Sequence, residues 1–172
     1  MAYRNKTYVA FASEDIKYYR LMEAWRENNH IDFNFYDAHD LYVALDTSQP
    51  DTIRRRLRER LNNTKQVIML VSNNLKAKSS RSNSFIYYEI EVIKKLNLPI
   101  VFANLNMSRT SHSENIPQQL NDLYTMSVSC QPKIIKYALD NYCEQFEANL
   151  NQPTPKKGPY HYLESVYQEL GI

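Results

Sequence analysis

From the N-terminus to about residue 150, segments with two different patterns of apolar and polar residues follow one another in turn. Short aliphatic or β-branched runs predict strands, and apolar residues spaced three or four apart predict helices. The predicted strands are 7–12, 33–36, 66–72, 99–105 and 124–130. The predicted helices are 15–28, 85–96 and 132–150, with a short one near 116–123 and a polar loop at 73–83. Ser48 and Asp51 form a capping-box signature with Pro50 near the first turn, which predicts a further helix that ends at about residue 61. Strand–helix alternation implies an α/β domain with a parallel sheet covered on both faces.

The last part of the chain departs from this alternation. The segment NQPTPKKGP, at 151–159, has the composition of a linker, and 160–170 predicts a small terminal helix. We therefore expect one domain over 1–150, followed by a linker and short C-terminal helix over 151–172.

One predicted helix carries a carboxylate on its apolar side. In SFIYYEIEVIKK, at 84–95, the apolar residues fall within an arc of roughly 160°, and Glu89 lies near its middle. Glu91 and the two lysines occupy the opposite side. A buried lone carboxylate is costly unless it pairs, accepts hydrogen bonds or takes up a proton. Glu89 therefore either meets an arginine or a backbone amide at the rim of the core, or points into a cleft as catalytic carboxylates do.

In a five-stranded sheet of order 2-1-3-4-5, ligands bind at the carboxyl ends of strands 1 and 3, where the order reverses. Polar residues follow the predicted strands at that edge, and the Glu89 helix begins just after the loop of strand 3. The segment DAHD at 37–40 is also consistent with a simple turn. The candidate residues of this edge are Phe11, Ser13, Asp15, Tyr36, Asp37, Asp40, Ser72 and Asn73.

Composition excludes several classes of site. The only glycines are Gly158 and Gly171, so a Walker A loop and a dinucleotide-binding glycine fingerprint are both excluded. Strand 3 ends in VSNN without the aspartate of a response-regulator receiver. Four dispersed histidines and two cysteines lack metal-site spacing, so we expect no metal.

Charge and hydropathy place the chain among globular proteins without a nucleic-acid partner. The net charge is +2, and the arginine run at 54–60 fits a solvated helix face, with phosphate or partner binding as the alternative. Neither a signal peptide nor an apolar run long enough for a membrane span is visible, and the two cysteines fit a reducing compartment. We expect a cytoplasmic protein that does not bind membranes.

The order of these motifs resembles the TIR-like family that includes the TIR-like proteins of bacterial Thoeris anti-phage defence. The resemblance covers roughly residues 6 to 150 and rests on FASED at 11–15, FYDAHDLYVALDTS at 35–48 and YYEIEVIKKLNLPIVFANLN at 87–106. It implies a flavodoxin-like TIR fold with a five-stranded, mostly parallel sheet of order 2-1-3-4-5. Relatives commonly carry Arg-Trp immediately before the catalytic glutamate, whereas this chain has Tyr87-Tyr88, which retains aromatic character without the positive charge.

The resemblance also implies an activity. Glu89 matches the catalytic glutamate of TIR enzymes, which cleave the nicotinamide–ribose bond of NAD and often form a cyclic ADP-ribose isomer. NAD is then a substrate, no cofactor is needed, and the other candidate residues line the substrate. The implied partners are a signal-reading effector protein and further copies of the chain.

Two other functions fit the same residues. One is a non-catalytic TIR-like module that binds a nucleotide or a protein. The other is an enzyme similar to the nucleoside deoxyribosyltransferases, whose related sheet also uses a glutamate.

Overall fold

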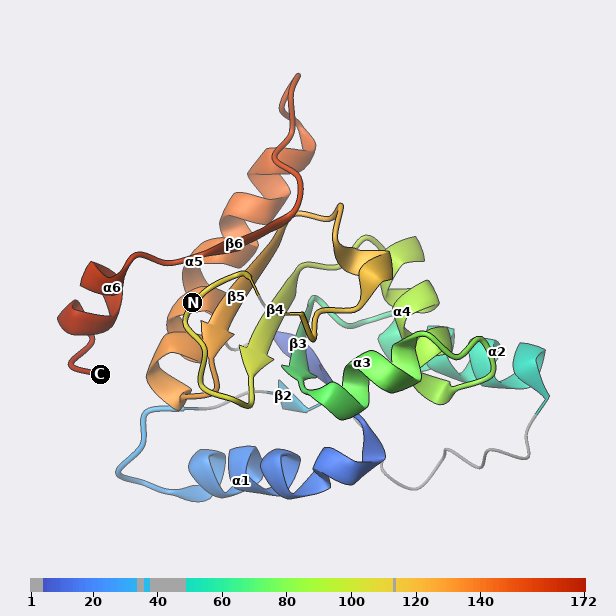
Figure 1. The fold of residues 1–172 in the computed structure, drawn as a ribbon, viewed down its shortest axis with the longest axis horizontal. Coiled ribbons are helices and arrows are strands. Elements are labelled where there is room, and N and C mark those ends of the chain that lie inside the picture. Colours follow the sequence, from blue (N-terminus) through green and yellow to red (C-terminus); the bar gives the residue numbers. More distant parts are fainter. Residues whose placement is uncertain (1–4, 34–35, 38–48, 113) are drawn as a thin grey trace.

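A parallel six-stranded sheet forms the centre of the protein in the computed structural model, which describes residues 5–33, 36–37, 49–112 and 114–172 (Figure 1). The order is β2-β1-β3-β4-β5-β6, and each neighbouring pair is parallel. The strands are β1 (Lys6–Ala10), β2 (Tyr36–Asp37), β3 (Gln66–Val71), β4 (Ile100–Asn104), β5 (Thr125–Ser129) and β6 (Pro159–His161). The predicted flavodoxin-like class and the order 2-1-3-4-5 are confirmed, and β6 is an additional strand beside β5.

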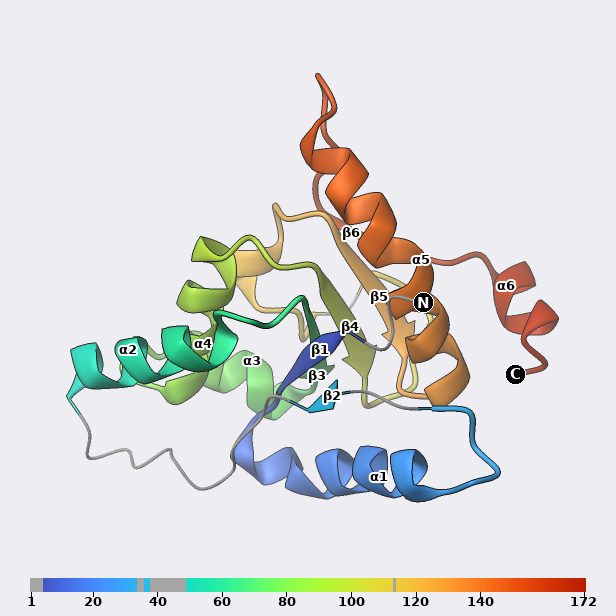
Figure 2. The same ribbon diagram turned by 180° about the vertical axis from the view of Figure 1, so that it is seen from behind.

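Helices cover both faces of this sheet (Figure 2). The α-helices are α1 (Ile16–Glu27), α2 (Pro50–Leu61), α3 (Asn73–Ser79), α4 (Phe85–Lys95), α5 (Pro132–Leu150) and α6 (Glu164–Glu169), with short 3₁₀ helices η2 (Ser13–Asp15) and η3 (Gln118–Leu120). One apolar layer joins the sheet to α1 and α5. The other joins it to α2, α3 and α4.

Strand alternation decides which layer each side chain enters. Successive residues of a strand point to opposite faces of the sheet, so Val9 and Ile68 join the layer of α1 and α5. Tyr8 and Met69 join the layer of α2, α3 and α4. All six residues of β3 are buried, as expected of a central strand covered on both faces.

A short helix occupies part of the segment predicted as a polar loop at 73–83. Ser72 caps α3 because its Oγ accepts a hydrogen bond from the backbone N–H of Leu75 at 3.0 Å. Leu75 is fully buried. Ser79 is the other buried residue of this helix. With a single buried apolar residue in seven, α3 shows no apolar periodicity, and the prediction of a loop was wrong for this reason.

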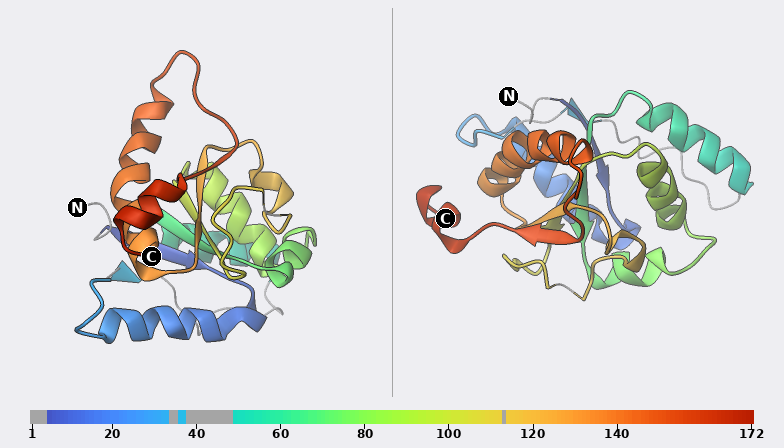
Figure 3. Two further views of the ribbon diagram at one scale, coloured as in Figure 1. Left: turned by 60° about the vertical axis from the view of Figure 1, so that its left-hand side comes forward. Right: turned by 90° about the horizontal axis from the view of Figure 1, so that it is seen from above.

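The C-terminal residues pack against the same sheet. Thr125 donates its backbone N–H to the carbonyl of Gly158 at 3.3 Å, where β6 joins the sheet. The segment 160–170, predicted as one helix, instead contains the end of β6 and the shorter helix α6. This helix returns to the start of α5, where Lys133 Nζ donates to the carbonyl of Leu170 at 3.0 Å (Figure 3). The division of the chain at residue 150 stays a prediction.

Among the helices in the described ranges, none has both the length and the apolar character needed to cross a bilayer.

Candidate functional site

The side chain of Glu89 lies inside the layer formed by α2, α3 and α4. It is in the middle of α4 and only 1% exposed. The hydroxyl of Tyr8, on β1, donates a short hydrogen bond to Glu89 Oε1. Glu89 Oε2 is buried, and no residue in the described part of the chain makes a hydrogen bond to it. One carboxyl oxygen is therefore held while the other is left without a partner.

Burial controls the ionisation of this carboxyl. Desolvation raises the pKa of Glu89 from 4.5 to about 8, against the opposing effects of the Tyr8 hydrogen bond and the charge of Arg60. Loss of hydration disfavours the charged form of a carboxyl, while a donated hydrogen bond and a nearby cation favour it. Glu89 consequently carries a proton in most molecules at neutral pH.

The geometry differs from both interpretations of the sequence. The hydrogen-bond partner of Glu89 is a buried tyrosine rather than an arginine or a backbone amide at the rim. With 1% exposure, the carboxyl is enclosed in the core layer and does not open to solvent. Tyr8 was missed, although the sequence carried a signal. A tyrosine in the short apolar run YVAFA brings a hydroxyl into a buried strand, and such a hydroxyl usually finds a partner.

A second polar cluster lies at the carboxyl edge of β1 and β3. Asp15 is 5% exposed and accepts a short hydrogen bond from the hydroxyl of Ser72 and a second from Asn74 Nδ2 at 3.1 Å. Beside it, Lys78 Nζ donates to Ser13 Oγ at 2.7 Å and pairs with Glu14 Oε2 at 2.8 Å. The structure thus brings together three of the predicted residues, Ser13, Asp15 and Ser72.

Lys78 was not predicted at this edge. Glu14 and Asn74 belong to the predicted strand ends FASED and VSNN but were not among the candidate site residues. Asn74 and Lys78 lie on α3, which the sequence pattern did not reveal. The Lys78 hydrogen bond and charge hold the pKa of Glu14 below its usual value.

The remaining predicted residues lie elsewhere. Phe11 is buried and stacks on Tyr19, with ring centroids 4.9 Å apart, in the layer of α1 and α5. Asn73 is exposed at the start of α3. Tyr36 and Asp37 form β2, paired with Lys6 and Thr7. Asp40 lies outside the described residues.

The hydrogen-bonded pair of Tyr8 and Glu89 is connected through the start of α4 to the polar cluster around Asp15, which we call the carboxyl-edge cluster. Ser84 caps α4 by accepting a hydrogen bond from the N–H of Tyr87 at 3.1 Å, and its hydroxyl donates to the carbonyl of Lys78 at 2.6 Å. Within the residues that the structure describes, no hydrogen bond links the Glu89 carboxyl directly to Asp15 or its neighbours. The two groups meet at this helix junction, and the expectation that Glu89 faces the carboxyl edge stays a prediction.

An arginine from α2 supplies a positive charge beside the Tyr87-Tyr88 pair. The guanidinium of Arg54 lies 4.9 Å from the ring centroid of Tyr88, which is close enough for a cation–π contact. Arg54 also pairs with Glu91 at 3.1 Å. At least this member of the arginine run is thus engaged within the protein rather than simply solvated.

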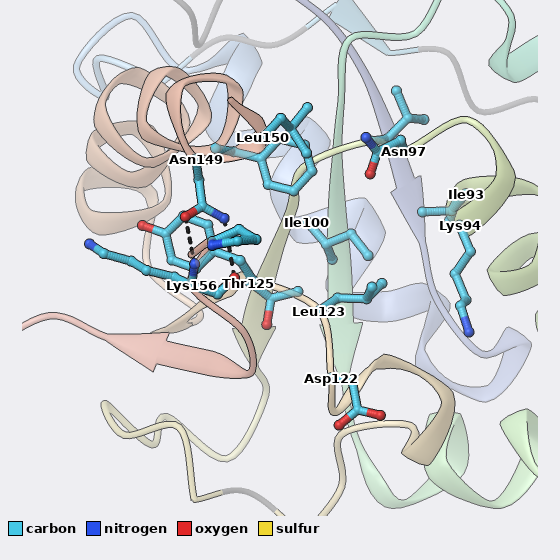
Figure 4. A pocket seen from close by; sticks show the side chains of 14 residues that line it. Ile93, Lys94, Asn97, Ile100, Asp122, Leu123, Thr125, Asn149, Leu150 and Lys156 are labelled. Atoms are coloured by element: carbon cyan, nitrogen blue, oxygen red, sulfur yellow. Dashed lines mark hydrogen bonds between the residues drawn. The ribbon is translucent and has the colours of Figure 1, made fainter. Parts of the chain in front are cut away.

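A cavity of about 150 Å³ lies at the opposite, amino ends of β4 and β5 (Figure 4). Apolar side chains, including Ile100, Leu123 and Leu150, form much of its wall. Its rim is fixed by Asn149, which accepts a hydrogen bond from the N–H of Lys156 at 2.7 Å and donates one to its carbonyl at 3.1 Å. This cavity is remote from the carboxyl edge and contains none of the predicted site residues.

No metal site is evident in the ranges given above for the structure. Within them, His, Cys, Asp and Glu side chains form no group of three that is suited to hold an ion.

A comparison with known protein families confirms the resemblance to the TIR-like family. A family model described as "Thoeris protein ThsB, TIR-like domain" matches residues 8–110, which is more than half of the chain. The match includes Tyr8, the carboxyl-edge cluster and Glu89. No curated protein matches the chain.

Proposed function

The chain belongs to the TIR-like domain family of Thoeris protein ThsB, and on this premise we propose that it cleaves the nicotinamide–ribose bond of NAD. The released ADP-ribosyl unit closes on itself to a cyclic ADP-ribose isomer. This nucleotide is a signal in anti-phage defence, and a separate effector protein reads it.

The proposed reaction breaks the bond between the ribose C1′ and the ring nitrogen of nicotinamide. The bonding electron pair leaves with nicotinamide, which becomes neutral, and positive charge develops on the ribose as an oxocarbenium-like centre. A nucleophilic atom of the same molecule then attacks C1′ to close the ring. A carboxylate beside C1′ stabilises the developing charge, and it does so more strongly in a desolvated site than in water.

The observation that carries the proposal is the buried carboxyl of Glu89, with Oε1 held by Tyr8 and Oε2 without a hydrogen-bond partner among the described residues. The nicotinamide ring of NAD is a cation. An opposite charge within a few ångströms lowers a carboxyl pKa by roughly 1 to 3. Starting from about 8, this effect is large enough to ionise Glu89 near neutral pH when the substrate binds. Glu89 would thus become an anion in the complex with NAD, where the reaction requires a negative charge.

The proposal includes an opening step, because Glu89 is 1% exposed. The substrate must separate part of α2 from α4 to reach the carboxyl, and assembly of several copies or a cellular trigger would drive this step. The carboxyl-edge cluster would bind the ribose hydroxyls and phosphates, with Lys78 as the cation for the pyrophosphate. The substrate is the only nucleotide required, and no cofactor is part of the mechanism.

The test is chromatography of nicotinamide and ADP-ribose products after incubation of the purified protein with NAD at high protein concentration. Wild type, Glu89→Gln and Glu91→Gln are compared. Glu91 is on the same helix, and its carboxylate pairs with Arg54 near the surface. We expect nicotinamide from wild type and Glu91→Gln, and none from Glu89→Gln.

The assay is repeated in lysates of phage-infected cells that express each form, which adds the cellular trigger as the second way to drive the opening step. Release of nicotinamide by Glu89→Gln at the wild-type rate would refute the role of Glu89. Absence of product from wild type under both conditions would refute the enzymatic proposal.

The burial of Glu89 favours a second candidate, a non-catalytic module that binds a nucleotide or a protein partner. In that case the neutral carboxyl is a hydrogen-bonded part of the core. This candidate predicts no turnover by any variant, and binding of NAD or a partner that is unchanged in Glu89→Gln.

A further inference from the structure

The hydroxyl of Tyr8 lies in the layer between the sheet and α4. Tyr8 is on β1 and fully buried, and its hydrogen bond to Glu89 spans 81 residues of sequence. The next β1 residue that enters this layer is Ala10. A phenylalanine would fill the same volume, so the hydroxyl is the feature of this side chain that packing alone does not require.

The hydroxyl contacts one carboxyl oxygen and leaves the other unbonded. Glu89 Oε1 accepts from Tyr8, and Oε2 is the oxygen without a partner in the described part of the chain. Because a carboxyl group is planar, fixing one oxygen on a rigid strand also fixes the direction of the second. This direction would otherwise vary by rotation about the last side-chain bond, which has a broad torsional preference.

Other charged groups near α4 are engaged elsewhere or act at longer range. Arg60 of α2 favours the ionised form of Glu89 by its charge, and Arg54 pairs with Glu91 on the outer side of α4. On α3, Lys76 Nζ bonds the carbonyl of Ile116 at 2.8 Å, and Lys78 bonds Ser13. Among the residues that the structure describes, Tyr8 is therefore the group with a direct hydrogen bond to the Glu89 carboxyl.

We propose that Tyr8 is a positioning residue for Glu89: it holds Oε1, directs Oε2 toward the reacting ribose and stabilises the carboxylate when Glu89 ionises. The catalytic part of this inference rests on the proposed function. The hydrogen bond to an ionised carboxylate is of the stronger, charge-assisted kind, so Tyr8 contributes most in the state that reacts.

The test is Tyr8→Phe, with Tyr88→Phe as the matched control. Tyr88 is also buried, at 5% exposure, but its ring contacts Arg54 rather than Glu89. The side-chain carboxyl ¹³C resonances of the glutamates are titrated by NMR, and Glu89→Gln assigns the signal of Glu89. We expect the titration midpoint of Glu89 to rise in Tyr8→Phe and to stay unchanged in Tyr88→Phe.

The kinetic readout is nicotinamide release as a function of pH. In Tyr8→Phe, we expect kcat at neutral pH to fall about ten- to hundredfold, the loss that corresponds to one hydrogen bond to a charged group. The limb of the pH–rate profile that reports Glu89 should move to higher pH. A residue that only supports packing would lower the rate without moving this limb.

Two outcomes would overturn the inference. One is an unchanged Glu89 midpoint in Tyr8→Phe, and the other is an equal loss of rate in both Tyr→Phe variants without a shift of the profile. Should Tyr8→Phe fail to fold, the ring Cζ resonance of Tyr8 in the wild type is followed instead. Its chemical shift must change with pH at the titration midpoint of Glu89. A chemical shift that does not change with pH refutes the hydrogen bond. These NMR titrations need no turnover. A wild type without product both as purified protein and in infected-cell lysate therefore refutes the proposed function, and the hydrogen bond is decided independently.

Discussion

Replacement of Glu89 by glutamine should stabilise the protein increasingly as the pH rises. Burial raises the pKa of Glu89 in the folded protein from 4.5 to about 8, so the folded state binds its proton more tightly than the unfolded state. The sign follows from this difference. The stabilising effect of the bound proton is complete below about pH 4.5 and is lost progressively up to about pH 8. Glutamine keeps a similar shape without an ionisable proton, and its contribution does not change across this range.

The size of the effect follows from the same two values. Each pH unit between 4.5 and about 8 removes up to about 1.4 kcal/mol from the free energy of unfolding of the wild type. Between about pH 5 and about pH 8, the difference between Glu89→Gln and wild type should therefore grow by roughly 3 to 4 kcal/mol in favour of the variant. This is a large part of the stability of a typical domain.

The assay is equilibrium urea unfolding of wild type, Glu89→Gln and Glu91→Gln in one buffer series from about pH 5 to about pH 8. Glu91→Gln introduces the same chemical change on the outer side of α4. Loss of the Glu91 carboxylate removes a partly exposed ion pair with Arg54, which contributes about 0 to 1 kcal/mol to the free energy of unfolding. A Glu89→Gln difference that changes by less than about 1 kcal/mol over the series would refute the reasoning, because the carboxyl would then ionise alike in the folded and unfolded states.

Two further predictions concern the supports of the fold. In Tyr167→Phe, the buried backbone N–H of Ser129 loses the hydroxyl to which it donates a hydrogen bond at 3.2 Å. Thermal unfolding should show that the free energy of unfolding falls by about 1 to 3 kcal/mol, and an unchanged melting temperature would contradict the docking of α6. In Asp15→Ala, Ser72 and Asn74 lose their shared acceptor; hydrogen exchange of α3 amides should accelerate about tenfold or more, whereas unchanged exchange would show that Asp15 does not hold α3.

The sequence by itself determined the class of fold and the unusual position of Glu89. The alternation of short apolar runs with amphipathic segments specified a parallel sheet with helices on both faces, and the structure has the expected order for the first five strands. The periodicity of α4 placed Glu89 on the apolar side, where it is indeed buried. Both features are local, because spacing along one helix or strand decides which of its sides is apolar.

Only the tertiary structure decided what Glu89 meets and which short elements form. Its partner Tyr8 lies 81 residues away, and α3 and β6 have too few core residues to show a period. Short elements are marginal on their own and form because packing and hydrogen bonds with the rest of the chain stabilise them. The raised pKa of Glu89 likewise depends on desolvation by neighbours from other elements. Spacing along the chain encodes which side of a segment is apolar, whereas the identity of a contact across the core exists only once the segments have packed.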